Sequence, residues 1–123
     1  MSTELGPSIS QINLARSVIK QNLIKTPVIP LKSDRWMEVL PRDTNVSVKL
    51  ELFQQAGSFK ARGAYLGIQN LSSEQKKQGV VAASGGNHAL AVSWAAAAAG
   101  VTAKITMPKT TDPYRIEGCR SVG

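Results

Sequence analysis

The feature that most constrains this chain is a strand, turn, helix and strand pattern in its second half. Val80 to Ala83 form a short apolar run, and the tight turn Ser84-Gly85-Gly86-Asn87 follows. The stretch 88–99 is rich in alanine, the best helix former, and Gly100 supplies the expected helix end. Val101 to Met107 form a second strand, closed by a proline. Such a βαβ unit requires a parallel sheet, so we predict the α/β class.

Local signals predict the remaining elements. Ser8 with Gln11 and Ser72 with Gln75 each fit a capping box, which marks the start of a helix. We predict a first helix that Thr26-Pro27 stops, with an apolar face of Ile9, Ile12, Ala15, Ile19 and Leu23. An apolar piece over 28–31 follows, and then a brief helix after Ser33 that carries Trp36, Met37 and Leu40. The later predictions are a strand over 46–52, a loop over 54–57, a helix over 59–71 capped by Ser58, a short helix ending at Gly79, and a helix starting at Asp112-Pro113. Gly63 and Gly67 inside the helix over 59–71 predict that another backbone packs closely against it.

Composition excludes several classes of protein. With 42% hydrophobic and 19% charged residues, the 123-residue chain suits one foldable domain, and its apolar runs are too short to span a membrane. The net charge of +7 is spread along the chain and aromatic residues are only 5%, so Arg62 and Arg115, the candidate contacts to nucleic acid, lie in no basic-aromatic patch. Cys119 is the single cysteine and the N-terminus does not resemble a secretory signal, so we expect a soluble, cytoplasmic protein.

Lys60 is the first candidate for chemistry. A helix starting at Phe59 places Lys60 on one stripe with Ala64, Gly67, Ile68 and Leu71, so we expect its amine to be partly desolvated. The positive end of the helix dipole also opposes its charge. Both effects favour the neutral amine that Schiff-base chemistry needs. The alternative is that Lys60 extends its ammonium into water.

The second candidate is the turn from Ser84 to His88. It lies at the carboxyl end of a strand and the start of a helix, which is where open parallel sheets bind ligands. Free N–H groups of the first helical turn favour an anion, and Ser84 and Asn87 add side-chain hydrogen bonds, so we predict a carboxylate or phosphate. The alternative is an ordinary turn with Asn87 capping the helix. With one histidine, His88, and one cysteine in the chain, we expect no metal site and no catalytic triad.

Together the two motifs resemble the fold type II pyridoxal-phosphate enzymes. The first motif, Gly57 to Ala64, reads GSFKARGA, and the second, Ser84 to Ala89, reads SGGNHA. Leu50 to Gln54, Thr26-Pro27 and Pro108-Lys109 also match, so the resemblance covers nearly the whole chain. Within that group the chain is most similar to threonine/serine dehydratases and their serine racemase relatives.

The resemblance implies a role for each candidate residue. Lys60 would carry pyridoxal 5′-phosphate as a Schiff base and then shuttle the substrate α-proton. Phe59 would lie beside the pyridine ring of the cofactor, and Asn87 would hydrogen-bond the cofactor's 3′-oxygen. The loop that receives the substrate carboxylate would comprise Ser84, Gly85, Asn87 and His88. The implied reaction removes water from L-threonine or L-serine and yields a 2-oxo acid and ammonia.

Departures from the pattern bear on which reaction is expected. Relatives that racemise serine carry a second serine where this chain has Gly85, which has no side-chain proton to give. Relatives that make cysteine by β-replacement usually carry Ser-Val-Lys and an acidic residue at positions 58–61, where this chain has Ser-Phe-Lys-Ala. Both departures favour elimination over racemisation and β-replacement.

The resemblance is to the N-terminal part of such an enzyme, because the family's glycine-rich phosphate cradle lies downstream. It assigns residues 1–52 to part of a large domain and 53–123 to most of a small domain, and it implies a homodimer or higher oligomer for the complete enzyme. The alternatives are a catalytically inactive fragment or interaction module, a β-replacement enzyme, and a racemase.

Overall fold

The computed structural model describes residues 6–31, 38–41 and 43–122. Its elements in chain order are α1 (Ile9–Ile19), β1 (Val28–Pro30), β2 (Ser47–Lys49), the 3-10 turns η1 (Glu51–Phe53) and η2 (Gln55–Gly57), α3 (Lys60–Gln69), α4 (Ser73–Gln78), β3 (Val80–Ala83), α5 (Asn87–Ala98), β4 (Ala103–Thr106) and α6 (Pro113–Arg120). Trp36 and Met37 of the predicted brief helix lie outside the described residues. Among the described residues, no helix is both long enough and apolar enough to cross a membrane.

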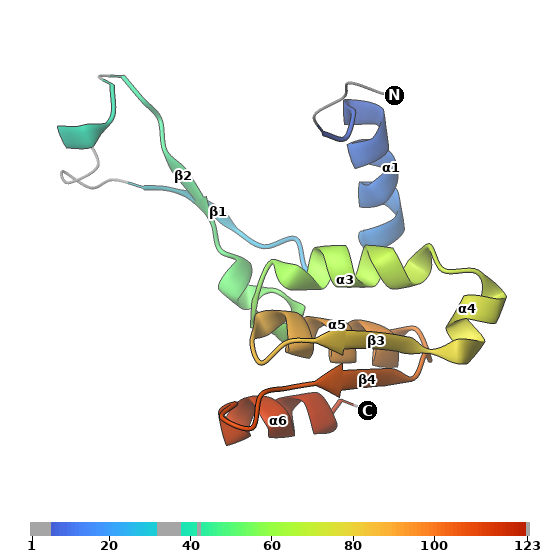
Figure 1. Ribbon diagram of the computed structural model, residues 1–123. Coiled ribbons are helices and arrows are strands. Elements are labelled where there is room, and N and C mark those ends of the chain that lie inside the picture. Colours follow the sequence, from blue (N-terminus) through green and yellow to red (C-terminus); the bar gives the residue numbers. More distant parts are fainter. Residues whose placement is uncertain (1–5, 32–37, 42, 123) are drawn as a thin grey trace.

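The predicted βαβ unit is present. Strands β3 and β4 pair in parallel, with Val80 opposite Ala103 and Ala83 opposite Thr106, and α5 connects them. Figure 1 shows α5 on one side of this pair, and α6 contacts α5. The chain turns between α4 and β3 at Gly79, whose φ of 84° is a left-handed conformation that favours glycine. The parallel pairing confirms the predicted α/β class.

The core lies between α3 and α5. From α3, the side chains of Ala61, Tyr65 and Ile68 are buried, and they pack with Ala95 and Ala96 of α5. Alanine side chains are small, so the two helices can approach closely. The alanine-rich segment is therefore both a strong helix former and the contact surface of this core.

The first helix follows its predicted start but not its predicted end. The Ser8–Gln11 capping box forms, since the Ser8 N–H donates to Gln11 Oε1 at 2.7 Å and the Gln11 N–H donates to Ser8 Oγ at 3.3 Å. The helix ends at Ile19, and Leu23 lies beyond it in a loop, where it packs into the core. No residue of α1 is buried, so the described part of the chain leaves the apolar face around Ile12 open.

Strand β2 is shorter than predicted. The alternation over 46–50 is present, with Val46, Val48 and Leu50 half-buried and the residues between them exposed. The strand itself covers Ser47–Lys49 and the backbone enters η1 at Glu51, so the predicted strand over 46–52 is too long by one residue at its start and three at its end. Strand β2 pairs antiparallel with β1, and Figure 1 shows this pair extending away from the α3–α5 layers.

Two expectations about α3 are wrong. A side-chain carbon added at Gly63 or Gly67 would meet no atom within 4 Å, so no described backbone packs against these glycines. Ser58 does not cap the helix: Phe59 holds the N-cap position, and Ser58 Oγ is buried without a hydrogen-bond partner among the described residues. The predicted Ser72–Gln75 capping box and the Asp112 cap of α6 are confirmed.

Candidate active site

The two sequence motifs lie at one end of the molecule. Strands β3 and β4 are parallel, so their carboxyl ends share an edge, and Figure 1 shows that α3 and α5 begin at this same end. The turn η2, two residues before Phe59, contacts α5. Lys60 begins α3 and Asn87 begins α5, so the fold gathers the starts of both helices at the edge where parallel sheets bind ligands.

Lys60 is exposed, contrary to the expectation that its amine is partly desolvated. The buried face of α3 runs through Ala61, Tyr65 and Ile68. The predicted stripe joins this face at Ile68, further along the helix, but Lys60 itself lies outside the core. Its Nζ lies 4.9 Å from the centroid of the Phe59 ring, within range of a cation–π contact. Phe59 is itself 59% exposed, so an aromatic ring and a primary amine lie together and open to a ligand.

The turn from Ser84 to Asn87 is held by main-chain and hydroxyl contacts. The Ser84 N–H donates to the Thr106 carbonyl at 2.9 Å, and the Gly86 N–H donates to Ser84 Oγ at 3.1 Å. Gly86, not Asn87, is the N-cap of α5, so the alternative in which Asn87 caps the helix is wrong. Among the described residues no side chain caps α5, which leaves N–H groups of its first turn for a ligand. His88 is exposed in that turn.

Gly85 packs tightly against the segment that follows β4. A side-chain carbon built on Gly85 would lie 2.7 Å from Thr111 Oγ1 and 3.4 Å from Pro108 Cδ. At Gly86 the nearest such atom is Ser84 Oγ at 4.0 Å. Of the two neighbouring glycines, only Gly85 has an atom within 3 Å of the position that a side-chain carbon would take.

The two arginines that were candidates for nucleic-acid contact both bind groups within the chain. Arg115 Nη1 donates to Asn87 Oδ1 at 2.9 Å, joining α6 to the start of α5. Arg62 donates from Nε and Nη2 to the two oxygens of Glu51 at 2.8 and 2.7 Å. The Arg115 contact belongs to the candidate site, and no local sequence signal marks it, because its partner is 28 residues away.

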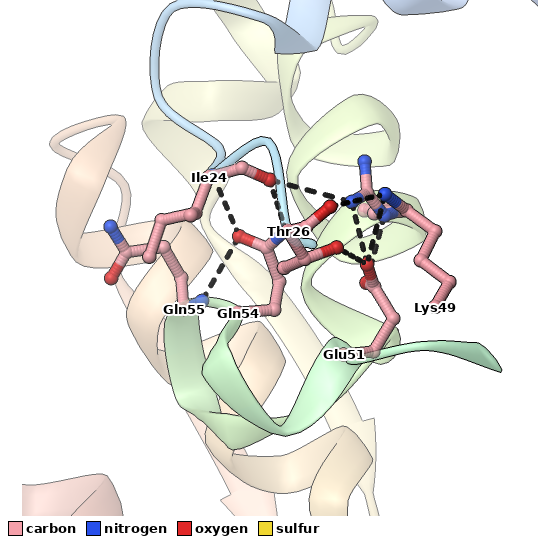
Figure 2. Close-up of polar contacts among 7 residues, drawn as sticks. Ile24, Thr26, Lys49, Glu51, Gln54 and Gln55 are labelled. Carbon is pink, nitrogen blue, oxygen red and sulfur yellow. Dashed lines mark hydrogen bonds and ion pairs between the residues drawn. The ribbon is translucent and has the colours of Figure 1, made fainter. Parts of the chain in front are cut away.

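Figure 2 shows the Glu51 network, which fixes the segment leading into α3. Besides Arg62, the Thr26 hydroxyl donates to Glu51, and the Gln54 amide pairs with both backbone groups of Ile24. The hydrogen bonds from Arg62 lower the pKa of the Glu51 carboxyl to about 2, with further lowering from Thr26 and the Lys49 charge, against the opposing effect of burial. This network ties the loop before β1 to the turns that precede Phe59 and Lys60.

No cluster of three or more histidine, cysteine, aspartate or glutamate residues that could hold a metal ion occurs in the part of the chain that the structure describes.

Comparison with known proteins identifies the family. The model of the family described as "Pyridoxal-phosphate dependent enzyme" matches residues 19–123. The chain is 42% identical to phenylserine dehydratase of Ralstonia pickettii, over 100% of the chain and 36% of that protein. It is 39% identical to the catabolic L-threonine dehydratase of Staphylococcus aureus, over 94% of the chain and 33% of that protein.

Solved structures of similar proteins support the same family assignment. The structure of maize serine racemase superposes with a TM-score of 0.82 and 36% identity, over 94% of this chain and 34% of that one. The processed form of threonine deaminase isoform 2 from Solanum lycopersicum gives a TM-score of 0.72 and 32% identity, over 96% of this chain and 33% of that one. The chain therefore belongs to the pyridoxal-phosphate-dependent enzymes, and it spans about a third of the length of the relatives that it matches.

The site residues fit part of this cofactor. Pyridoxal phosphate carries an aldehyde, which condenses with a primary amine such as that of Lys60, and a ring oxygen, which an amide N–H such as that of Asn87 can bind. Ser58 Oγ, buried and unpartnered among the described residues, adds an unused donor beside Phe59. We assign no cradle for the cofactor's phosphate within this chain.

Proposed function

We propose that the complete protein removes water from L-threonine or L-serine, using pyridoxal phosphate, and releases a 2-oxo acid and ammonia. The observation that supports the proposal is that α3, which begins at Lys60, and α5, which begins at Asn87, start at the same end of the fold as the carboxyl ends of β3 and β4 (Figure 1). The relatives named as dehydratases support this reaction class.

Each residue of the site has a defined task in this proposal. Lys60 holds the cofactor through its Nζ and moves the substrate α-proton at that atom. Phe59 packs beside the cofactor ring, and Asn87 donates an amide N–H to the ring 3′-oxygen. Pyridoxal phosphate, when bound, supplies the electron sink that stabilises negative charge at the substrate α-carbon.

The start of α5 binds and orients the substrate carboxylate. Its uncapped N–H groups and the positive end of the helix dipole favour an anion there. Ser84, Gly85, Asn87 and His88 line this turn. A fixed carboxylate orients the substrate α-carbon toward Lys60, which reduces the entropy cost of bringing the α-proton to the Lys60 amine.

The test uses the full-length protein. Borohydride reduction of the loaded protein, followed by peptide mapping, should label Lys60 and no other lysine. A Lys60→Ala variant should lose 2-oxo acid formation from threonine and serine, whereas Lys104→Ala, which removes another exposed lysine, should retain it. Label on a different lysine would contradict the assignment.

Racemisation is the second candidate reaction, because a serine racemase is among the similar structures. We favour elimination, since Gly85 offers no side-chain proton donor and a side chain there would crowd Thr111 Oγ1. Chiral analysis of a serine incubation should show pyruvate with little D-serine. Substantial D-serine would show that another group donates a proton on the second face.

The remaining expectations are proposals about the whole protein. Residues 1–52 would belong to a large domain and 53–123 to a small one, and the assembly would be a homodimer or higher oligomer in the cytoplasm. An inactive interaction module or a β-replacement enzyme would contradict the main proposal: the first would give no turnover, and the second would need a nucleophilic co-substrate. Light scattering of the full-length protein measures the oligomeric state.

A further inference from the structure

The contact between Arg115 and Asn87 links two helices at the candidate site. Asn87 is the first residue of α5, and Arg115 lies in the first turn of α6, where its backbone N–H is bound to the Asp112 carbonyl at 2.9 Å. Arg115 Nη1 donates to Asn87 Oδ1 at 2.9 Å. Asn87 is exposed at the start of α5, so its amide remains open to a ligand on its other side.

The chemistry of arginine determines how the Asn87 amide is turned. A guanidinium group has five N–H donors and no acceptor, so only the carbonyl oxygen of an asparagine can face it. With the oxygen bound to Arg115, the amide NH₂ group points elsewhere, and no described residue accepts a hydrogen bond from it. Without Arg115, the amide could rotate and present an acceptor to the same ligand.

We propose that Arg115 is a positioning residue that fixes the Asn87 amide as a hydrogen-bond donor toward the cofactor's ring oxygen. This inference rests on the proposed function, in which Asn87 binds that oxygen. The charge of Arg115 also polarises the amide, because hydrogen bonds in a chain strengthen one another, and a polarised N–H is a better donor. Arg115 thus acts on the cofactor only through Asn87.

The experiment measures the dissociation constant of pyridoxal phosphate for the full-length protein, by titration of the apo form. Arg115→Met keeps much of the side-chain length and removes the donors, and it should weaken binding about five- to tenfold, the size expected when one ordinary hydrogen bond, that from Asn87 to the cofactor, is no longer held in place. Arg115→Lys keeps a charged donor and should restore at least half of the lost affinity on a logarithmic scale. Arg120→Met, an exposed arginine on the same helix, is the matched control and should bind as the wild type does.

A double-mutant cycle separates positioning from a general structural role. In an Asn87→Ala background, Arg115→Met should cause no further loss of affinity, because the residue through which it acts is gone. An equal loss in both backgrounds would overturn the proposal. So would wild-type affinity in Arg115→Met, or an Arg115→Lys protein that binds no better than Arg115→Met. The thermal midpoint of each apo variant is measured as a check that the variant is folded. If Arg115→Met does not fold, Arg115→Lys replaces it in the double-mutant cycle with Asn87→Ala.

The proposed function and this inference fail in different ways. If borohydride labels no residue or one other than Lys60, the proposed function fails. If Lys60 is labelled and Asn87→Ala weakens binding while Arg115→Met does not, only the role of Arg115 fails. The cofactor's visible absorption spectrum provides a second readout, since a lost donor at the ring oxygen should change it in Arg115→Met and not in Arg120→Met.

Discussion

Replacing Gly85 by alanine tests how the carboxylate-binding turn is held. The new Cβ would lie 2.7 Å from Thr111 Oγ1 and 3.4 Å from Pro108 Cδ. Gly85 is not among the glycines with positive φ, so alanine meets no backbone strain there, and in the folded state its effect comes from the contact. Overpacking of this kind costs about 1–3 kcal/mol, and the reduced freedom of the unfolded chain offsets roughly 0.4–1 kcal/mol of it. We therefore expect a net loss of about 1–2 kcal/mol.

The neighbouring glycine provides the control. Gly86→Ala places a Cβ whose nearest neighbour is Ser84 Oγ at 4.0 Å, so its loss should be less than about 1 kcal/mol, arising from the N-cap preference for glycine over alanine. Thr111→Ala removes the closest atom, so the double variant Gly85→Ala with Thr111→Ala should recover most of the loss caused by Gly85→Ala.

Thermal unfolding of the full-length variants measures these differences. Midpoints are compared because a protein of several domains need not unfold in two states. A loss of this size should lower the midpoint for Gly85→Ala by roughly 2–6 °C. The reasoning is refuted if Gly85→Ala is as stable as Gly86→Ala, or if removing the Thr111 side chain brings no recovery.

Four further substitutions test other contacts. Glu51→Gln should destabilise the protein near neutral pH by roughly 1–2 kcal/mol. The lowering of the Glu51 pKa corresponds to about 3 kcal/mol, and partial solvent exposure of the carboxylate reduces that contribution. The pKa of Glu51 is about 2 in the folded protein, below its ordinary value of 4.5, so the ionised carboxylate stabilises the fold above pH 4.5 and this stabilisation is lost as the pH falls toward 2. Urea unfolding of the wild type and of Glu51→Gln should therefore show a smaller difference in stability at pH 3 than at pH 7. Gly63→Ala and Gly67→Ala should each raise the thermal midpoint, by the equivalent of about 0.5–1 kcal/mol, since nothing lies within 4 Å of either, and a lowered midpoint would show that another segment covers this face. Gly79→Ala should lower the midpoint strongly, because its φ is 84° and its Cβ would lie 2.7 Å from the Thr102 carbonyl oxygen.

Features that depend on neighbours in sequence could be predicted well. Both capping boxes, the parallel βαβ unit and the Asp112-Pro113 helix start are present, because each depends on residues a few positions apart. The turn that begins at Ser84 could also be placed at the carboxyl end of a parallel strand, since it follows β3 directly. These features define the fold class and the location of the site.

Features that depend on distant partners could not be predicted. Glu51 continues the alternation of a strand, yet its carboxylate pairs with Arg62, and the backbone turns into η1 at this point. The stripe that contains Lys60 shares Ile68 with the buried face of α3, and only the packing of α3 on α5 determines that Ala61 and not Lys60 is buried. Helical periodicity indicates how wide an apolar face is. It does not show which side of the helix faces the core when small residues such as Ala and Gly border that face.

The most informative difference concerns Asn87. Its sequence position allows two uses, capping the helix or binding a ligand, because an asparagine at a helix start can do either. The structure places Gly86 at the N-cap and binds the Asn87 carbonyl to Arg115, so the oxygen that would have capped α5 is already used. The N-cap residue Gly86 has no side chain, so the first turn of α5 has no side-chain cap among the described residues, and the Arg115 contact turns the Asn87 amide nitrogen toward other partners. The start of α5 therefore presents two kinds of donor, main-chain groups suited to a carboxylate and, through Arg115, an amide suited to a ring oxygen.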